Sequence, residues 1–251
     1  MAVTPSGMGG SPTALLAELR RRAPSRPFVT YYDLAGEGRT ELSVATFANW
    51  VAKTVALLSE EGDVGPGDRV SLVLPTHWLG LVWPMAVWSV GGVVVLEPEP
   101  TATLRVRSVD EVDAAQATEG LVVVSTLPWG GPAGAGTPPG ALDYGREVLR
   151  QPDELGPTPD AAPRDRDDPL VRLLEQAAAR LHSRAGSRLM VVSERTTARV
   201  LRDALLVPLL GDGSTVLVAA AEDEDAERLG QVASVERAVV AAGGAGSVPP
   251  A

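Results

Sequence analysis

The stretch "GPGDRVSLVLPTH", residues 65–77, joins a turn, a short apolar run and a polar end. Two glycines around a proline open it and favour a tight turn, because glycine reaches backbone angles that other residues avoid. The branched apolar run after Arg69 is typical of a strand buried in a parallel sheet. We therefore expect Thr76 and His77 at the carboxyl end of a strand, which is where open α/β sheets bind their ligands.

Composition sets limits on the class of protein. The chain has 251 residues, 45% of them hydrophobic, which is enough to bury the core of an α/β protein. Its net charge of −10 and its scattered basic residues argue against a nucleic-acid partner. Because there is no cysteine, disulfides and thiolate metal sites are excluded. The opening "MAVTPSGMGGSP" lacks the pattern of a secretion signal, so we expect a cytoplasmic protein.

The segment "THWLGLVWPMAVWSVGGVVVL", residues 76–96, carries no formal charge and is long enough to raise the hypothesis of a membrane span. Gly80, Pro84 and the glycine pair 91–92 interrupt it, however. A glycine pair followed by a valine run is typical of a helix end and a buried strand. We therefore predict a buried helix and a strand, with the membrane span as the alternative.

The rest of the chain alternates predicted strands and helices, which favours an α/β fold of three layers with a mainly parallel sheet and flanking helices. Predicted strands are 27–33 and 39–43, which form a hairpin, and 69–74, 104–106, 121–125, 188–193, 214–218 and 237–241. Predicted helices lie near 12–22, 44–58, 76–89, 109–118, 143–151, 169–181 and 197–210, with an acidic helix start at 222–225.

Changes in composition predict the domain organisation. A segment rich in proline and aspartate, "QPDELGPTPDAAPRDRDDP", reads as a linker. We expect a flexible N-terminus (1–10), an α/β subdomain (11–150), this linker (151–169), a second α/β segment packed on the first (170–241) and a disordered tail (242–251).

Residues 13–98 resemble the N-terminal domain of adenylate-forming (AMP-binding, acyl-CoA synthetase-like) enzymes. The resemblance rests on a hairpin, a helix, the "GPGDRV" turn, a buried strand and the helix-to-strand junction "AVWSVGGVVVL", in that order. "RLMVVSERTTARVLRDALLVPLLGDGSTVLV" (188–218) is similar to the segment that follows the phosphate loop of that superfamily. The chain is identified as a member of an actinobacterial family of short proteins distantly related to these enzymes, which implies a truncated version of their N-terminal domain.

The resemblance also implies a Ser/Thr/Gly-rich loop that ends in lysine and wraps the phosphates of ATP, and this loop is missing. Its expected place holds "PRDRDDPL" (163–170), which has acids and prolines instead. The glycine-rich "GGPAGAGTPPG" (130–140) has no lysine, and its prolines lack the N–H donors of a phosphate cradle. Lys53 is the single lysine and reads as a solvated residue in the middle of a helix. The later adenine and ribose motifs and the catalytic lysine of the superfamily have no counterpart in this sequence.

Polar residues at predicted strand ends form the candidate ligand pocket. They are Thr76, His77, Ser193, Glu194 and Thr196. A histidine without a neighbouring acid, nucleophile or metal ligand also fits a structural role, and Ser193 or Thr196 also fits the cap of the next helix. No catalytic residue and no metal ligand set is predicted.

Two functions remain compatible with these residues. The first is a non-catalytic relative of the AMP-binding enzymes, without a cofactor, that binds a ligand or another protein. The second is an ATP-dependent acid ligase whose site diverges or is completed by a partner chain, with ATP or AMP as ligand. An apolar helix surface near Trp83 and Val87 is the expected contact for a protein partner or a second copy.

Overall fold

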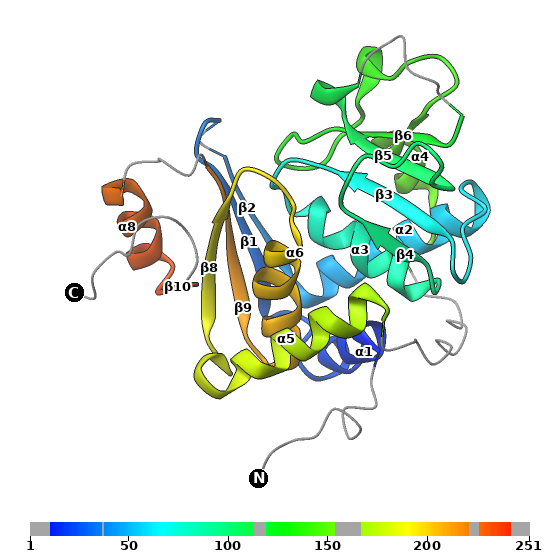
Figure 1. Ribbon diagram of the computed structural model, residues 1–251. Helices are drawn as coiled ribbons and strands as arrows, with labels where there is room; N and C mark the ends of the chain where they lie inside the picture. The colour runs from blue at the N-terminus through cyan, green and yellow to red at the C-terminus, as the bar shows by residue number, and fades with distance from the viewer. Residues whose placement is uncertain (1–10, 37, 113–118, 154–166, 221–225, 242–251) are drawn as a thin grey trace.

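The computed structural model describes residues 11–36, 38–112, 119–153, 167–220 and 226–241, which form two five-stranded sheets with helices between and beside them (Figure 1). The predicted α/β class and the mainly parallel strands are confirmed. The division of the strands between two sheets is a feature that the sequence did not indicate. The predicted flexible N-terminus (1–10), the tail (242–251), most of the linker, the acids 222–225 and most of the helix near 109–118 lie outside the described residues.

Sheet A combines strands from both ends of the chain. Its strand order is β10-β8-β9-β1-β2, and only the β1–β2 hairpin is antiparallel. The predicted hairpin is therefore confirmed, and its first strand pairs in parallel with β9. The strands of sheet A are β1 (Pro27–Asp33), β2 (Gly38–Ser43), β8 (Arg188–Ser193), β9 (Ser214–Ala219) and β10 (Val239–Val240).

Sheet B is parallel throughout and has the order β4-β3-β5-β6-β7. Successive side chains of a strand point to opposite faces, so Val70 and Leu72 on β3 join the main core while Ser71 points to the other face. All the carboxyl ends of sheet B lie along one edge, because its strands run the same way. The strands are β3 (Arg69–Val73), β4 (Val93–Val95), β5 (Leu104–Ser108), β6 (Leu121–Val124) and β7 (Leu142–Asp143).

Most of the helices fill the space between the two sheets, while α8 covers the outer face of sheet A (Figure 1). On β9, Leu217 faces the inner helices, whereas Val216 and Val218 pack against α8. The longer helices are α1 (Pro12–Arg22), α2 (Val44–Glu60), α3 (Leu79–Ser89), α5 (Pro169–Arg184) and α8 (Ala226–Val235). The shorter ones are η2 (Val109–Glu111), η3 (Gly134–Gly136), α4 (Tyr144–Glu147), η4 (Val148–Arg150), α6 (Ala198–Val200), the π-helical η5 (Leu201–Leu206) and α7 (Val207–Leu210).

Side-chain caps explain where the helices begin. The hydroxyls of Ser11 and Ser43 and the carboxylate of Asp168 accept hydrogen bonds from backbone N–H groups of α1, α2 and α5, as serine and aspartate commonly do at the start of a helix. At α6, however, the cap is Thr197, and the alternative of Ser193 or Thr196 as cap is wrong. These two hydroxyls are used elsewhere, because each donates to a carbonyl outside the helix.

Segment 76–96 forms the predicted helix and strand, α3 and β4. The helix has 11 residues, and every one of them is buried. No helix within the described ranges is both long and apolar enough to cross a bilayer. The apolar side chains of this segment thus form part of the main hydrophobic core.

The expected partner surface near Trp83 and Val87 is corrected by the structure. Both side chains are fully buried, since α3 lies among α1, α2 and sheet B and has no face toward solvent. The Trp83 ring contacts the ring of Tyr144 at a centroid distance of 5.0 Å. The large apolar side chains that are exposed lie elsewhere, at Leu127, Trp129, Leu149, Val235 and Val239.

Lys53 is also placed differently from the prediction. Its side chain is 18% exposed, and its ammonium group donates to the carbonyl of Gln151 and lies 2.6 Å from Asp153. The single lysine of the chain therefore ties α2 to the segment after η4, and it is not a solvated side chain.

A buried ionic cluster fastens the segment after α8 to sheet A. The Glu236 carboxylate is 8% exposed and accepts hydrogen bonds from Tyr32 (2.6 Å), Arg39 (3.0 Å) and Arg188 (2.5 Å). Burial would raise the pKa of Glu236, but these donors outweigh it and lower the pKa to about 2. The charged form of Glu236 is therefore the stabilising one.

We expect the Glu236→Gln variant to lower the free energy of unfolding at pH 7 by about 1–3 kcal/mol, because it removes the charge from a hydrogen-bonded cluster. The folded-state pKa lies below the ordinary value of 4.5, so the stabilisation is complete above pH 4.5 and disappears as the pH falls toward 2. Urea unfolding at pH 7 and pH 3 measures both effects. Glu175→Gln, at an exposed position on α5, is the control. An equal cost of E236Q at the two pH values would contradict this assignment.

Candidate functional site

The carboxyl ends of β3 and β8 are joined although the two strands belong to different sheets. The Thr76 amide donates to the Glu194 carbonyl (2.8 Å), and the Thr196 amide donates to the Leu74 carbonyl (3.0 Å). An antiparallel bridge between Pro75 and Arg195 lies between these bonds. The two strand ends therefore form one unit, which we call the strand-end junction (residues 74–77 and 193–196).

The structure brings the five predicted pocket residues into this junction. Thr76, His77 and Thr196 are buried, Ser193 is partly buried and Glu194 is exposed. The Thr196 hydroxyl donates to the Pro75 carbonyl (3.2 Å), whereas the Thr76 hydroxyl has no hydrogen-bond partner among the described residues.

His77 is packed between aromatic rings. Its ring lies 4.7 Å from the ring of Tyr31 and 5.1 Å from that of Trp78, measured between centroids. The Leu79 amide donates to its Nδ1 (3.2 Å), so the proton of the neutral ring is on Nε2, which has no partner of normal geometry in the described part of the chain. Burial lowers the pKa of His77 to about 3, and the nearby Leu127 backbone offsets only part of this shift. His77 is neutral at physiological pH and cannot supply a cation to a phosphate.

Two charged residues outside the list of predicted pocket residues also lie at the junction. Glu111, in the short helix after β5, forms an ion pair with Arg195 (2.8 Å). The second carboxylate oxygen of Glu111 is buried and has no partner within the described ranges. Both residues follow the carboxyl end of a strand, which is the signal that would have included them among the candidates.

The loop after β6 borders the same region. The Pro128 carbonyl accepts hydrogen bonds from the Thr40 hydroxyl and the Trp78 indole, both at 2.9 Å. On either side of this fixed carbonyl, Leu127 and Trp129 are 60% and 70% exposed. The loop backbone is thus fixed at Pro128, while the two neighbouring apolar side chains are exposed to solvent.

In the glycine-rich loop 130–140, backbone N–H groups bind the carboxylate of an aspartate from the same chain. The Asp143 carboxylate is buried and accepts hydrogen bonds from the amides of Ala133 (3.1 Å) and Gly134 (3.0 Å). The amides of Gly136 and Thr137 donate to carbonyls within the same loop. A group of backbone N–H donors is what a phosphate would need, and here a carboxylate occupies it.

A carboxylate also binds the backbone N–H donors at the start of α5. The Asp168 carboxylate accepts from the Leu170 amide (2.8 Å), and Asp167 forms an ion pair with Arg172 (3.0 Å). The described part of "PRDRDDPL", residues 167–170, therefore places two carboxylates and no lysine at the start of α5.

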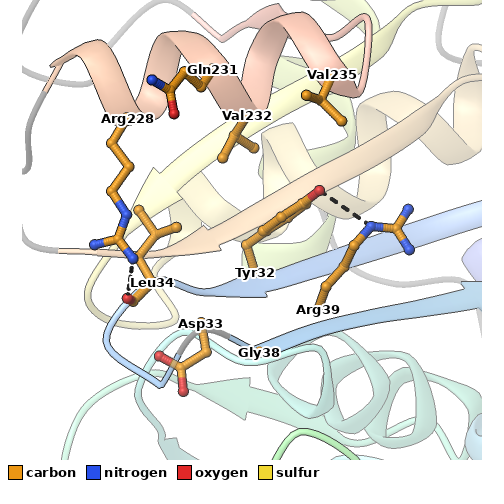
Figure 2. A pocket seen from close by; sticks show the side chains of 9 residues that line it. All are labelled: Tyr32, Asp33, Leu34, Gly38, Arg39, Arg228, Gln231, Val232 and Val235. Atoms are coloured by element: carbon orange, nitrogen blue, oxygen red, sulfur yellow. Dashed lines mark hydrogen bonds between the residues drawn. The ribbon is translucent and has the colours of Figure 1, made fainter.

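Among the surface cavities of the described residues are three that none of the five predicted pocket residues lines. One lies between α8 and the β1–β2 hairpin (Figure 2), one between β4 and α5, and one among residues 134–147. Within the described ranges, no group of three or more His, Asp or Glu side chains is placed to hold a metal ion.

Comparison with known proteins finds relatives both by sequence and by fold. No family model matches the chain. A TIGR03089 family protein from Mycobacterium tuberculosis (strain ATCC 25618 / H37Rv) is 34% identical over 225 residues, which cover 86% of this chain and 91% of that protein.

Three solved structures share the fold. An acyl-CoA synthetase from Brucella canis has a TM-score of 0.68 at 17% identity, and the match covers 93% of this chain and 47% of the synthetase. An acetoacetyl-CoA synthetase from Streptomyces lividans has 0.70 at 17%, with 90% and 41% covered. A benzoate CoA ligase from Burkholderia xenovorans LB400 has 0.59 at 16%, with 84% and 46% covered. The predicted likeness to AMP-binding enzymes is confirmed at the level of the fold, and the chain spans less than half of each of these structures.

The packing of α3 against the junction depends on Gly80. A Cβ atom at this position would lie 2.2 Å from the Thr196 hydroxyl oxygen. We expect Gly80→Ala to cost about 1–3 kcal/mol of unfolding free energy, as an overpacked core contact does. Gly230→Ala is the matched control, because this helical glycine has open space around it and the change should stabilise by about 0.5–1 kcal/mol.

Thermal or urea unfolding of both variants checks this expectation. The double variant G80A/T196A should recover part of the loss, because it removes the clashing hydroxyl. A purely additive result would show that this contact is not the cause.

The buried, neutral state of His77 predicts a pH dependence of stability. The unfolded chain takes up a proton below pH 6.5, whereas the folded chain does so only near pH 3. The unfolding free energy should therefore fall with decreasing pH in this window, by up to about 1.4 kcal/mol per pH unit. We expect His77→Phe to flatten this slope between pH 6.5 and 5, and the exposed His182→Gln to leave it unchanged. An unaltered slope in H77F, measured by urea unfolding, would contradict the assignment.

Proposed function

The chain belongs to the TIGR03089 family, and from this premise and its AMP-binding enzyme fold we propose that it is a non-catalytic relative of those enzymes with a role in binding, most directly of a protein partner. Adenylation transfers charged phosphate groups and depends on cations and fixed donors that stabilise them. A site that retains the scaffold but offers carboxylates in those places has lost this capacity.

The observation that carries the proposal is the position of Asp143. Its carboxylate accepts from the amides of Ala133 and Gly134, so the glycine-rich loop after β6 already holds a carboxylate. A phosphate would have to displace a buried carboxylate and then lie next to it, and both steps are unfavourable. The loop therefore works as a structural connection.

Three further features support the proposal. The cap of α5 is filled by Asp168, and His77 at the strand-end junction is neutral. Lys53 pairs with Asp153 on the surface beside α2, so the only lysine of the chain has a structural partner. No described feature of these three groups favours phosphate binding.

The second candidate is an ATP-dependent acid ligase whose site is completed by another chain. It is favoured by the likeness to synthetases and a CoA ligase of which this chain spans less than half. The exposed Leu127 and Trp129 beside the junction would then contact the completing chain. In this case the residues at the junction, Thr76 and Ser193 among them, would contribute to the ligand pocket.

Isothermal titration calorimetry with ATP and with AMP, each with magnesium, separates the two functions. We expect no saturable heat at concentrations that would reveal a Kd up to about 100 μM. An active acyl-CoA synthetase measured in parallel validates the titration, and a cooperative thermal transition shows that the sample is folded. Saturable nucleotide binding, or ATP–pyrophosphate exchange with a carboxylic acid, would overturn the non-catalytic assignment.

A further inference from the structure

A groove follows the free edge of sheet B, where α5 begins beside β4 (Figure 1). β4 is the outermost strand of this sheet, with β3 as its neighbour among the described strands. The groove has a volume of about 340 Å³, and residues 93–97 line one side of it. A cavity over one face of a strand is lined by alternate residues, so a run of five consecutive residues places this groove along the strand's edge. We call it the β4 groove (residues 93–97 on one side and 168–176 on the other).

The backbone along this edge carries hydrogen-bonding groups that β3 does not use. The Val93 amide donates to the Asp68 carbonyl (2.7 Å), and the parallel ladder continues with Val95 beside Ser71. Successive residues of a strand direct their N–H and C=O groups to opposite sides, so those of Val94 point away from β3 and toward the groove. Such an edge is a template for one more strand.

The inner wall of the groove is apolar. Trp88, Leu170 and Leu201 line it and are at most 3% exposed. Val94 and Leu173 are partly buried against the main core, so each keeps apolar surface open to the groove. An apolar side chain that entered here would remove this surface from water, which is favourable.

The charge that stays free at the groove is negative. Glu97 is exposed, and its carboxylate has no ion pair or hydrogen bond within the described ranges. On the α5 side, by contrast, Arg172 forms an ion pair with Asp167 (3.0 Å), and the Asp168 carboxylate accepts from the Leu170 amide. The carboxylate of Glu97 has the same sign as the net charge of the chain, −10, so a basic partner is attracted both at long range and at the groove.

We propose that the β4 groove binds an extended segment of a basic partner protein, which adds to the free edge of β4 as a further strand. The backbone of the segment pairs with the N–H and C=O of Val94, one apolar side chain contacts Leu170 and Leu173, and a lysine or arginine lies next to Glu97. A peptide backbone matches the donor and acceptor of a strand edge at the spacing that the strand sets, and a small molecule does not. A second copy of this chain is disfavoured as the occupant, because each copy carries a charge of −10.

This inference rests on the proposed binding role and adds the surface and the chemistry of the partner. Its test contains no nucleotide, so its failure is distinguishable from a failure of the non-catalytic assignment. A fluorescein-labelled peptide in which valine and lysine alternate is titrated with the full chain, and fluorescence anisotropy is measured. We expect saturation with a Kd below about 1 mM.

A methylated form of the peptide tests the added strand without any change in the protein. Methyl groups on its central backbone nitrogens remove the N–H donors and leave the side chains and the charge as they were. Because strand addition depends on these donors, we expect the methylated peptide to bind at least tenfold more weakly.

The variant Glu97→Lys tests the location. We expect it to weaken binding of the unmethylated peptide at least fivefold at low salt, because it reverses the free charge of the groove. Glu60→Lys is the matched control, since Glu60 is exposed at the end of α2, outside the groove, and the net charge of the chain changes equally. Circular dichroism melts show whether both variants keep the wild-type fold, and Glu97→Gln provides a second variant if E97K does not.

Three results would overturn the proposal. The first is the absence of saturation up to about 1 mM peptide. The second is equal binding of the methylated peptide, which would exclude strand addition. The third is an equal effect of E97K and E60K, which would place the peptide elsewhere or reduce its binding to long-range attraction.

If the peptide does not bind, two measurements identify a different occupant. Saturable binding of octylamine would assign the groove to a small amphiphilic cation. Self-association of the chain in sedimentation velocity, weakened by Val94→Pro, would assign the edge to a second copy.

Discussion

The burial of α3 is the constraint on which the other parts of the fold depend. This helix has no polar face, so a stable structure must cover it on all sides, and α1, α2 and sheet B all contact it. The same helix contacts β3 and also η5, which packs on β8, so it lies beside both strands whose ends are joined by the bonds of Thr76 with Glu194 and of Thr196 with Leu74. The strand-end junction is therefore a consequence of core packing, and Gly80 is the point where helix and junction touch.

Local sequence patterns were sufficient to predict most of the helices and strands and some of the residues of the strand-end junction. The hairpin and the prediction of a helix and a strand in segment 76–96 depend on residues near one another in the chain, and the structure confirms them. The candidate site residues meet because each follows the end of a parallel strand. Other features depend on contacts between segments that are distant in the sequence. They are the two-sheet arrangement, the burial of Trp83, the ion pair of Lys53 with Asp153 and the hydrogen bonds of Asp143 to the loop at 133–134. No spacing or composition rule reports such contacts.

Aspartates occupy positions that in a nucleotide-binding protein would attract phosphate. Asp143 fills a loop of backbone donors and Asp168 fills the start of a helix, so the donors are satisfied without a ligand. The same residues contribute to the net charge of −10, which repels polyanions at long range. The acidic composition and the local hydrogen bonds thus both disfavour phosphate binding, and Leu127 and Trp129 are among the large apolar side chains that stay exposed at the surface.

The pairing of β1 with β9 has a consequence for the way the chain acquires its structure. Residues 27–33 are synthesised well before their parallel neighbour at 214–219. Sheet B, by contrast, is built from one continuous stretch between Arg69 and Asp143 and can form while synthesis continues. The parallel pair of β1 and β9 in sheet A can form only after β9 has been synthesised. Its formation is also slow, because closing the long loop between the two strands is entropically costly. Until β9 is available, the β1 edge of the hairpin has no strand partner. This unpaired edge exposes the nascent chain to aggregation.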